Sequence, residues 1–308
     1  MTLEISVVGP EAAAAVVATI HAGFGARKVL DPPSTALLET VESVRSALAE
    51  HGGVVACQDG QVVGSLLFEP HDDAHGQQLG LRRVSVLPRA QRSGVAKVMT
   101  EYAERVAAER GWSGIRLAAR TELPATVRFW HNLGYRELEH RGPLMTMAKE
   151  LPLEYATPTA ERTRDLGRRL GPLLRPGDLV ILSGDLGAGK TTFTQGLGQG
   201  LGVRGEITSP TFVIARVHPS LAAGPALVHV DAYRLGGLGE LDDLDLDTSV
   251  ESSVTVVEWG SGVAEGLADD RLEVRITRAA GDDLDERRMI ELVPIGARWL
   301  GSGLHALG

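Results

Sequence analysis

The sequence predicts two successive α/β domains, on the strength of three observations. The chain has 308 residues, of which 43% are hydrophobic, and this length exceeds the usual size of one core. Two prolines within Leu151–Pro158 separate an expected strand (144–149) from an expected helix (160–174). Each half also contains a strand-like run followed by a glycine-containing loop and a helix-like segment. We therefore expect domains at residues 1–150 and 155–308.

Composition limits the classes of partner. The formal net charge is −9, and nearly all of the acidic excess follows residue 150, so the second half is a poor partner for nucleic acid. Its run 240–247 is either a solvated face or a contact for a basic partner. The single Cys57 excludes intramolecular disulfides and cysteine-rich zinc sites. The chain shows no signal-peptide pattern and no twenty-residue apolar run, so we expect a cytoplasmic protein without membrane contact.

In the first half, residues 81–88 alternate like a strand, and residues 95–110 form an amphipathic helix. Between them, residues 91–96 follow the pattern [QR]-x-x-G-x-[GA]. Such a turn aims backbone N–H groups and a helix N-terminus at a pyrophosphate. The residues expected to bind this ligand are Val84, Val86, Gln91, Arg92, Ser93, Gly94, Val95 and Ala96.

Further strands are expected at 62–68, 115–120 and 144–149, with a helix end at 129–135 closed by Gly134. Over residues 3–149, the turn and these elements resemble motifs A and B of the GNAT acetyltransferases. The resemblance implies a GNAT-like mixed α/β domain that binds acetyl-coenzyme A and transfers the acetyl group to an amine.

Acetyl transfer needs a base for the ammonium proton and commonly an acid for the departing thiolate. The position where the family often has a tyrosine acid is Trp130, which has no ionisable proton, and Leu123 stands where asparagine is usual. Glu69 and His71, after the strand 62–68, are possible bases or solvated surface residues. Both interpretations remain open.

In the second half, apolar runs at 179–183, 212–217, 226–230, 254–257, 272–276 and 289–293 predict a mixed α/β sheet. The run 179–183 leads into Gly184, Gly189, Lys190 and Thr191, which have the spacing G-x-x-x-x-G-K-[ST]. In such a phosphate-binding loop the backbone cradles a polyphosphate, the lysine reaches the β- and γ-phosphates, and the hydroxyl binds Mg²⁺.

Three more signals lie at the ends of later runs. Hydroxyls in Thr208–Phe212 stand where a γ-phosphate-sensing loop would be. Asp231 ends the strand that contains His229, and Glu258 ends the next one. A carboxylate at such an edge, beside a phosphate loop, suits a magnesium ligand or a group that orients water.

The order of these motifs resembles the TsaE family, the ATPase subunit of the bacterial machinery that makes threonylcarbamoyladenosine in tRNA. The resemblance covers residues 155–295. It implies that Thr191 and Glu258 hold Mg²⁺, that Asp231 acts near the γ-phosphate or the attacking water, and that Trp259 lies near the nucleotide. The implied catalytic residues are Lys190, Asp231 and Glu258, and the loop around ATP comprises Leu186, Gly187, Ala188, Gly189, Lys190, Thr191 and Thr192.

The same resemblance implies TsaD-type and TsaB-type partner subunits, with tRNA contacted only indirectly. Here Gly260 and Ser261 follow Trp259, where the family usually has a polar run. A functional arginine near the last strand is either Arg287 or Arg288.

Two other classes of function fit the same loop. A small-molecule kinase would need an acceptor pocket and an arginine-rich lid, whereas residues 234–250 are acidic. A nucleotide-dependent binding module would hydrolyse ATP only incidentally. A GTPase is disfavoured because the sequence has no Asn-Lys-x-Asp motif for guanine.

Overall fold

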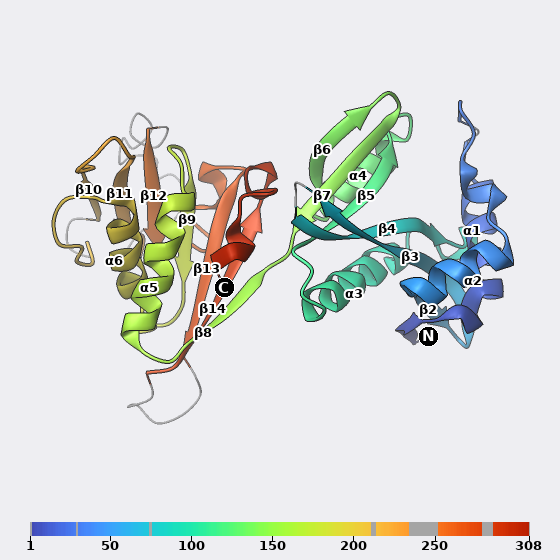
Figure 1. Cartoon of the computed structure of the whole chain (residues 1–308), viewed down its shortest axis with the longest axis horizontal. Helices are drawn as coiled ribbons and strands as arrows, with labels where there is room; N and C mark the ends of the chain where they lie inside the picture. Colours follow the sequence, from blue (N-terminus) through green and yellow to red (C-terminus); the bar gives the residue numbers. More distant parts are fainter. Residues whose placement is uncertain are drawn as a thin grey trace. The chain divides into compact units, whose positions relative to one another are not determined.

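The computed structural model of the chain describes residues 2–28, 30–73, 76–210, 214–233, 252–278 and 286–307. The chain divides into two compact units, Met1–Leu151 and Pro152–Gly308, and each contains a seven-stranded sheet (Figure 1). The predicted fold class is confirmed: both units are mixed α/β.

The first sheet has the strand order β1-β2-β3-β4-β5-β7-β6. Of the pairs in this sheet, β4 and β5 run parallel and the others are antiparallel. Its strands are β1 (Leu3–Val8), β2 (Gly53–Gln58), β3 (Gln61–Asp73), β4 (Gly76–Val86), β5 (Gly114–Arg120), β6 (Arg136–Arg141) and β7 (Leu144–Glu150). Its helices are α1 (Ala13–Gly25), α2 (Val41–Glu50), α3 (Val95–Glu109) and α4 (Pro124–Asn132).

Helices cover both faces of the first sheet. On one face, Ile20 of α1 and Val44 of α2 pack with Leu67 of β3. On the other face, Met99 of α3 packs with Leu79 of β4. Because successive strand residues point to opposite faces, β2 and β3 each contribute residues to both clusters.

The second sheet has the order β10-β11-β12-β9-β13-β14-β8. The four strands β11, β12, β9 and β13 run parallel, and the outer strands pair antiparallel. Its strands are β8 (Leu153–Thr157), β9 (Leu179–Ser183), β10 (Ala215–His218), β11 (Ala226–Asp231), β12 (Ser253–Glu258), β13 (Arg271–Arg278) and β14 (Arg288–Ile295), and its helices are α5 (Ala160–Leu170) and α6 (Lys190–Leu201).

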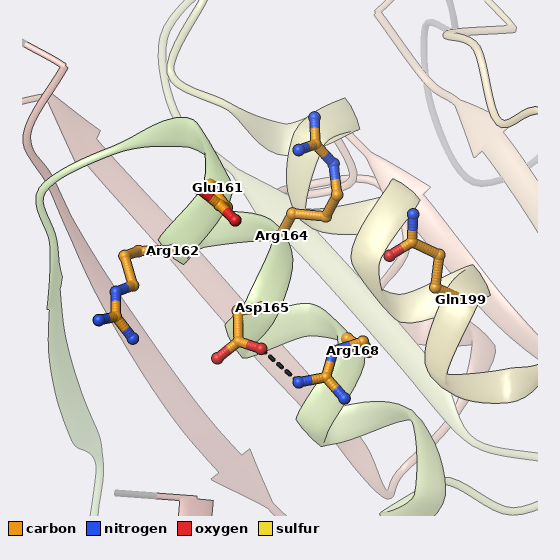
Figure 2. A pocket seen from close by; sticks show the side chains of 6 residues that line it. All are labelled: Glu161, Arg162, Arg164, Asp165, Arg168 and Gln199. Carbon is orange, nitrogen blue, oxygen red and sulfur yellow. Dashed lines mark hydrogen bonds and ion pairs between the residues drawn. The ribbon is translucent and has the colours of Figure 1, made fainter.

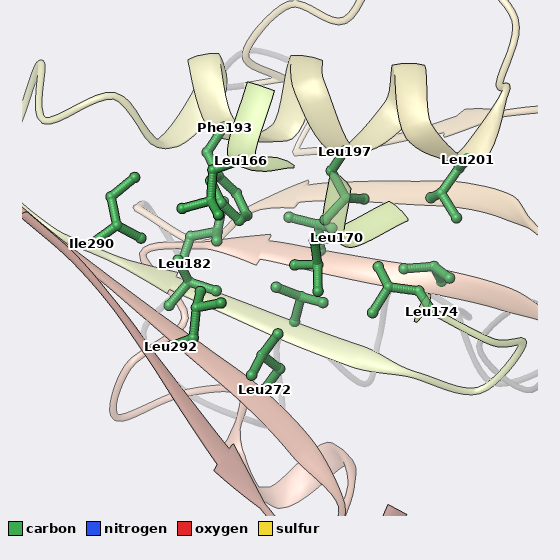
Figure 3. Close-up of a cluster of buried hydrophobic side chains, with 14 of the residues drawn as sticks. Leu166, Leu170, Leu174, Leu182, Phe193, Leu197, Leu201, Leu272, Ile290 and Leu292 are labelled. Atoms are coloured by element: carbon green, nitrogen blue, oxygen red, sulfur yellow. The ribbon is translucent and has the colours of Figure 1, made fainter. Parts of the chain in front are cut away.

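In the described part of the second unit, α5 and α6 cover the same face of its sheet. Figure 3 shows leucines of α5 and α6, with Phe193, packed over side chains of the central strands. The helices approach closely because glycines line their contact: a Cβ at Gly196 would overlap the carbonyl oxygen of Arg164, and one at Gly200 that of Arg168. This contact fixes α6, and with it the loop that precedes α6.

Most predicted elements appear within a few residues of their expected bounds, and the structure corrects three. The segment between the expected strand 144–149 and the expected helix 160–174 contains a further strand, β8, which pairs with β14. The helix expected over 160–174 ends at Leu170 and continues as a 3-10 turn, Gly171–Leu173. Strand β3 continues to Asp73. Part of the expected run 212–217 lies outside the described residues.

Candidate functional site

The loop between β9 and α6 has the backbone of an anion-binding turn. Gly184, Gly187 and Gly189 have φ of +144°, +74° and +111°, which side chains rarely adopt. A Cβ at Gly184 would overlap the carbonyl oxygen of Ile276 on β13. Gly189 is the N-cap of α6, so the first N–H groups of that helix and its positive end are directed to the loop. The loop therefore offers backbone donors to a phosphate.

Lys190, the first residue of α6, brings its ammonium group into this loop. Its Nζ donates to the carbonyl oxygens of Gly184 at 2.7 Å and Asp185 at 3.0 Å. The same atom lies 3.6 Å from the centroid of the Trp259 ring, a cation–π contact. Burial lowers the pKa of Lys190, and the charge of Glu258 opposes this shift. Lys190 and Trp259, both predicted to lie at the nucleotide, are thus brought together.

Glu258 and Thr191 form the candidate metal site. Glu258 ends β12 and is 3% exposed. Its Oε2 accepts a hydrogen bond from Thr191 Oγ1 at 3.1 Å, and its Oε1 accepts one from His229 Nε2 at 2.8 Å. A hydroxyl and a carboxylate oxygen, adjacent to each other and to a phosphate loop, are ligands that Mg²⁺ accepts. The residues present therefore fit this ion.

Asp231 is next to Glu258 in the parallel register of β11 and β12. Its Oδ2 accepts from Ser209 Oγ at 3.1 Å, and its Oδ1 accepts from the backbone N–H of Tyr233 at 3.0 Å. The two neighbouring carboxylates therefore accept hydrogen bonds from separate donors. Thr211 and Phe212, from the predicted phosphate-sensing segment, lie outside the described residues.

The opposite side of the loop is held by Arg288. Its Nε donates to the carbonyl oxygen of Ala188 at 2.9 Å, and its Nη1 donates to that of Arg287 at 3.0 Å. Arg288, one of the two arginines that the sequence left open, thus contacts the loop. Ala188 is 1% exposed and Leu186 is 88% exposed, so the tip of the loop projects into solvent, and Thr192 continues the first turn of α6.

Sequence reasoning missed His229 as a member of this site. The sequence indicates only that His229 belongs to the strand that ends in Asp231. The alternation along that strand was the available signal, because residues two apart point to the same face. What the sequence lacked was the pairing of β11 with β12, which brings the imidazole to Glu258.

In the first unit, β4 separates from β5 before either strand ends. Their parallel pairing stops at Leu81 and Leu117, whereas β4 continues to Val86 and β5 to Arg120. Arg83 has a φ of +52°, and the register with β3 shifts at this point, so β4 contains a bulge. The predicted ligand contacts Val84 and Val86 lie in the part of β4 that is no longer paired with β5.

The turn after β4 resembles the phosphate loop in its backbone. Arg92 and Gly94 have φ of +64° and +85°, and Gly94 is the N-cap of α3, which begins with Val95–Ala96. Gln91 Nε2 donates to a carbonyl oxygen of β4 at 3.2 Å, and Ser93 Oγ donates to one of the preceding 3-10 turn at 2.8 Å. These polar side chains bond to the chain itself, which leaves backbone N–H groups for a ligand.

Trp130 is a core residue. It is 4% exposed, and its ring contacts that of Tyr135 edge-on at a centroid distance of 5.4 Å. Tyr135 donates its hydroxyl to Glu104 Oε1 at 3.0 Å, and burial raises its pKa. The hydroxyl of this aromatic neighbour is therefore engaged by the Glu104 carboxylate.

Glu69 and His71 lie within β3, not after it. Glu69 Oε1 accepts from Arg82 Nη1 at 3.0 Å, and its Oε2 lies 3.6 Å from His71 Nε2. The imidazole lies over Gly80 of β4, where a Cβ would be 2.6 Å from Nε2. Burial lowers the pKa of His71, so its neutral form predominates near pH 7. The Glu69 carboxylate is therefore ion-paired with Arg82 and lies close to the His71 imidazole.

A separate hollow of about 500 Å³ lies on α5 and α6 (Figure 2). The sequence did not predict it, and none of its lining residues belongs to the phosphate loop. Both acidic and basic side chains of α5 line it, with a hydrogen bond between Arg168 and Asp165 at 2.5 Å. The lining residues are Glu161, Arg162, Arg164, Asp165, Arg168 and Gln199.

Two further expectations concern the surface. The acidic run 240–247 lies outside the described residues. In the described ranges of the chain, the structure contains no helix that combines the length and the apolar character needed to cross a membrane.

Comparison with protein families matches each half separately. Residues 157–289 match the family "Threonylcarbamoyl adenosine biosynthesis protein TsaE". Residues 28–135 match the acetyltransferase (GNAT) family. Both resemblances expected from the motifs are confirmed by these matches.

Individual proteins show the same division. The tRNA threonylcarbamoyladenosine biosynthesis protein TsaE of Streptomyces coelicolor is 65% identical over 145 residues, which are 47% of this chain and 98% of that protein. The structure of YdiB from Bacillus subtilis is 34% identical and covers 50% of this chain and 95% of its own, with a TM-score of 0.40. The structure of PaiA N-acetyltransferase from Thermoplasma acidophilum, in complex with coenzyme A, is 15% identical. It covers 49% of this chain and 99% of its own, with a TM-score of 0.43.

Proposed function

The chain belongs to the TsaE family through its second half, and from this premise we propose that residues 155–308 form a Mg²⁺-dependent ATPase serving the threonylcarbamoyladenosine modification of tRNA. One observation carries the proposal. At the C-terminal ends of β9 and β12, the phosphate loop lies together with the buried Lys190 and the hydrogen-bonded pair Thr191 and Glu258.

Each residue has a role that its contacts support. Backbone N–H groups of Leu186–Thr192 would cradle the phosphates, and Lys190 would exchange its loop carbonyls for phosphate oxygens. Thr191 and Glu258 would hold Mg²⁺, which when bound neutralises charge on the phosphates. Asp231, on the neighbouring strand, would orient the attacking water, and Trp259 would lie beside the nucleotide.

The acidic character of the second half fits a subunit that acts through other proteins. We infer TsaD-type and TsaB-type partner subunits in the cytoplasm, with tRNA held by them and not by this chain. ATP hydrolysis would reset the partner complex between turnovers instead of forming the threonylcarbamoyl bond. Affinity capture from the native cytoplasm tests this directly: both subunit types should co-purify, and their absence would contradict the assignment.

A nucleotide-dependent binding module is the main alternative, with a small-molecule kinase as the other. ATP hydrolysis measured with and without the partner subunits separates them. The proposed ATPase releases phosphate to water and responds to the partners. A binding module exchanges nucleotide with little turnover. A kinase consumes ATP slowly until an acceptor is added, and then transfers the phosphoryl group to that acceptor and releases ADP.

For residues 1–150 we propose a domain that binds acetyl-coenzyme A through the backbone of Gln91–Ala96. Two observations support this: the left-handed turn at the N-terminus of α3, and the separation of β4 from β5. Transfer to an amine would proceed without a side-chain acid at Trp130, so the thiolate would take its proton from solvent. Titration calorimetry of the full chain with acetyl-coenzyme A tests binding, and the absence of heat at sub-millimolar ligand would contradict it.

A further inference from the structure

A buried histidine lies directly beneath the candidate metal site. His229 is 0% exposed and lies on β11 two residues before Asp231. Leu227, two residues earlier still, belongs to the core that α5 and α6 cover. Because alternate strand residues share a face, His229 and Asp231 point to the same side of the sheet as the start of α6.

Only one of the two ring nitrogens of His229 has a hydrogen-bond partner among the described residues. Its Nε2 lies 2.8 Å from Glu258 Oε1, and an ionised carboxylate can only accept, so Nε2 carries the hydrogen. Its Nδ1 is buried without a hydrogen-bond partner among the described residues. Such a buried atom is unfavourable, and an apolar side chain would avoid it. The imidazole is therefore explained by its bond to Glu258 and not by packing.

We propose that His229 is a positioning residue that fixes the Glu258 carboxylate for Mg²⁺ at the nucleotide site. The proposal rests on the ATPase function proposed above. With Oε1 held by the imidazole, Oε2 stays beside Thr191 Oγ1 at 3.1 Å. The two oxygens expected to bind the metal are thereby kept adjacent before any ligand arrives.

We expect the loss of this hydrogen bond to lower the affinity of the site for Mg²⁺. Without the bond from His229, the Glu258 side chain gains rotational freedom, and that freedom must be lost again when the metal binds. Partners that orient metal ligands typically change affinity or activity by about 10-fold to 100-fold when they are removed. Nucleotide binding without metal should be unaffected, because His229 contacts no residue of the phosphate loop in the described contacts.

Two substitutions of His229 distinguish the effect of its hydrogen bond to Glu258 from the effect of having a polar side chain at this position. His229→Gln places an amide donor at about the reach of Nε2, whereas the shorter His229→Asn places it near Nδ1, out of reach of Glu258. His218→Asn is the matched control, because His218 on β10 is also a buried histidine, 4% exposed, and among the described contacts it makes no hydrogen bond to Glu258. Should His229→Asn not fold, His229→Leu replaces it.

The measurement is the binding of a fluorescent ATP analogue at increasing Mg²⁺ concentration, with thermal unfolding of each variant as the check on folding. We expect His229→Asn to raise the Mg²⁺ midpoint at least about 10-fold, with unchanged analogue affinity in EDTA. His229→Gln should stay within about 3-fold of the wild type, and His218→Asn should leave the midpoint unchanged.

Two results would overturn the proposal: a wild-type midpoint in His229→Asn, or equal losses in the Asn and Gln variants, which would indicate packing alone. Failure of the underlying function looks different. In that case the wild type itself shows no effect of Mg²⁺, or Lys190→Ala binds the analogue and hydrolyses ATP normally.

Discussion

Each half of the chain has a left-handed glycine at the N-terminus of a helix, but the side chains around the two glycines differ. Gly94 and Gly189 are both left-handed N-caps, with φ of +85° and +111°, and each precedes a helix that is packed on a sheet. Around Gly189 lie a buried lysine and the buried carboxylates of Glu258 and Asp231. Around Gly94, the neighbouring polar side chains bond to their own backbone.

The surroundings of the two loops distinguish the requirements for binding a phosphate from those for breaking a phosphoanhydride bond. A turn of N–H groups at a helix N-terminus is sufficient to bind phosphate. Breaking a phosphoanhydride bond also requires groups that stabilise developing charge and position metal and water. We therefore expect substitutions at the second loop to affect turnover, and substitutions at the first loop to affect affinity.

The largest expected effect follows removal of charge or metal ligand at the second loop. Lys190→Ala or Thr191→Ala should each lower ATP turnover by about 10³-fold, because phosphate charge is no longer neutralised or the metal loses a ligand. Steady-state phosphate release measures this, with thermal unfolding to show that the fold is intact. Near-normal hydrolysis by either folded variant would remove this loop from the active site.

A smaller effect on binding than on turnover is expected for Glu258→Gln. Neutralising the carboxylate disturbs metal and water geometry, so turnover should fall by about 100-fold while nucleotide affinity changes by less than about 10-fold. Glu273→Gln on β13 is the control, because Glu273 pairs with Arg271 and Arg275 instead of the loop. Equal losses of affinity and turnover would make Glu258 structural.

At the first loop, Gly94→Glu should abolish acetyl-coenzyme A binding. The protein itself leaves open space there, so the loss would come from charge repulsion and crowding of the pyrophosphate, with added backbone strain. Gly111→Glu beyond the other end of α3 is a matched control, since Gly111 has a φ of +79° and equal space. Calorimetry on both variants decides whether the loop, and not strain in general, is responsible.

The smallest expected effect is on stability. Gly196→Ala pushes a methyl group into the backbone of Arg164, so the second unit should lose about 1–3 kcal/mol of unfolding free energy. Gly25→Ala, with nothing within 4 Å of its added Cβ, should be neutral. Thermal unfolding tests both, and an unchanged transition in Gly196→Ala would show that α5 and α6 can separate at little cost.

The parts of the fold that local sequence determines were predicted closely. Strand β9 spans Leu179–Ser183, as the apolar run indicates, because the glycines fix where it ends. Strand β8 was missed because its partner β14 lies more than a hundred residues away along the chain. The helices α1 and α2 were missed as well; α1 has a run of alanines and valines in place of a clear polar face.

The candidate site shows the same limit. Lys190 and Thr191 follow from one short motif, so their positions could be predicted from sequence. The contacts of Glu258 with His229 and Thr191 depend on β12 lying between β11 and β9, an order that the sequence does not display. Likewise, the contact of Arg288 with the loop depends on the antiparallel pairing of β14 with β13.

Calorimetric titration of the full chain with ATP plus Mg²⁺, and separately with acetyl-coenzyme A, tests most directly whether the two loops bind different ligands. The wild type should bind both. Lys190→Ala should bind ATP at least about 10-fold more weakly and acetyl-coenzyme A as before, and Gly94→Glu should show the reverse. If either substitution weakened both ligands equally, or left its own ligand unaffected, the account of two separate phosphate-binding loops would be contradicted.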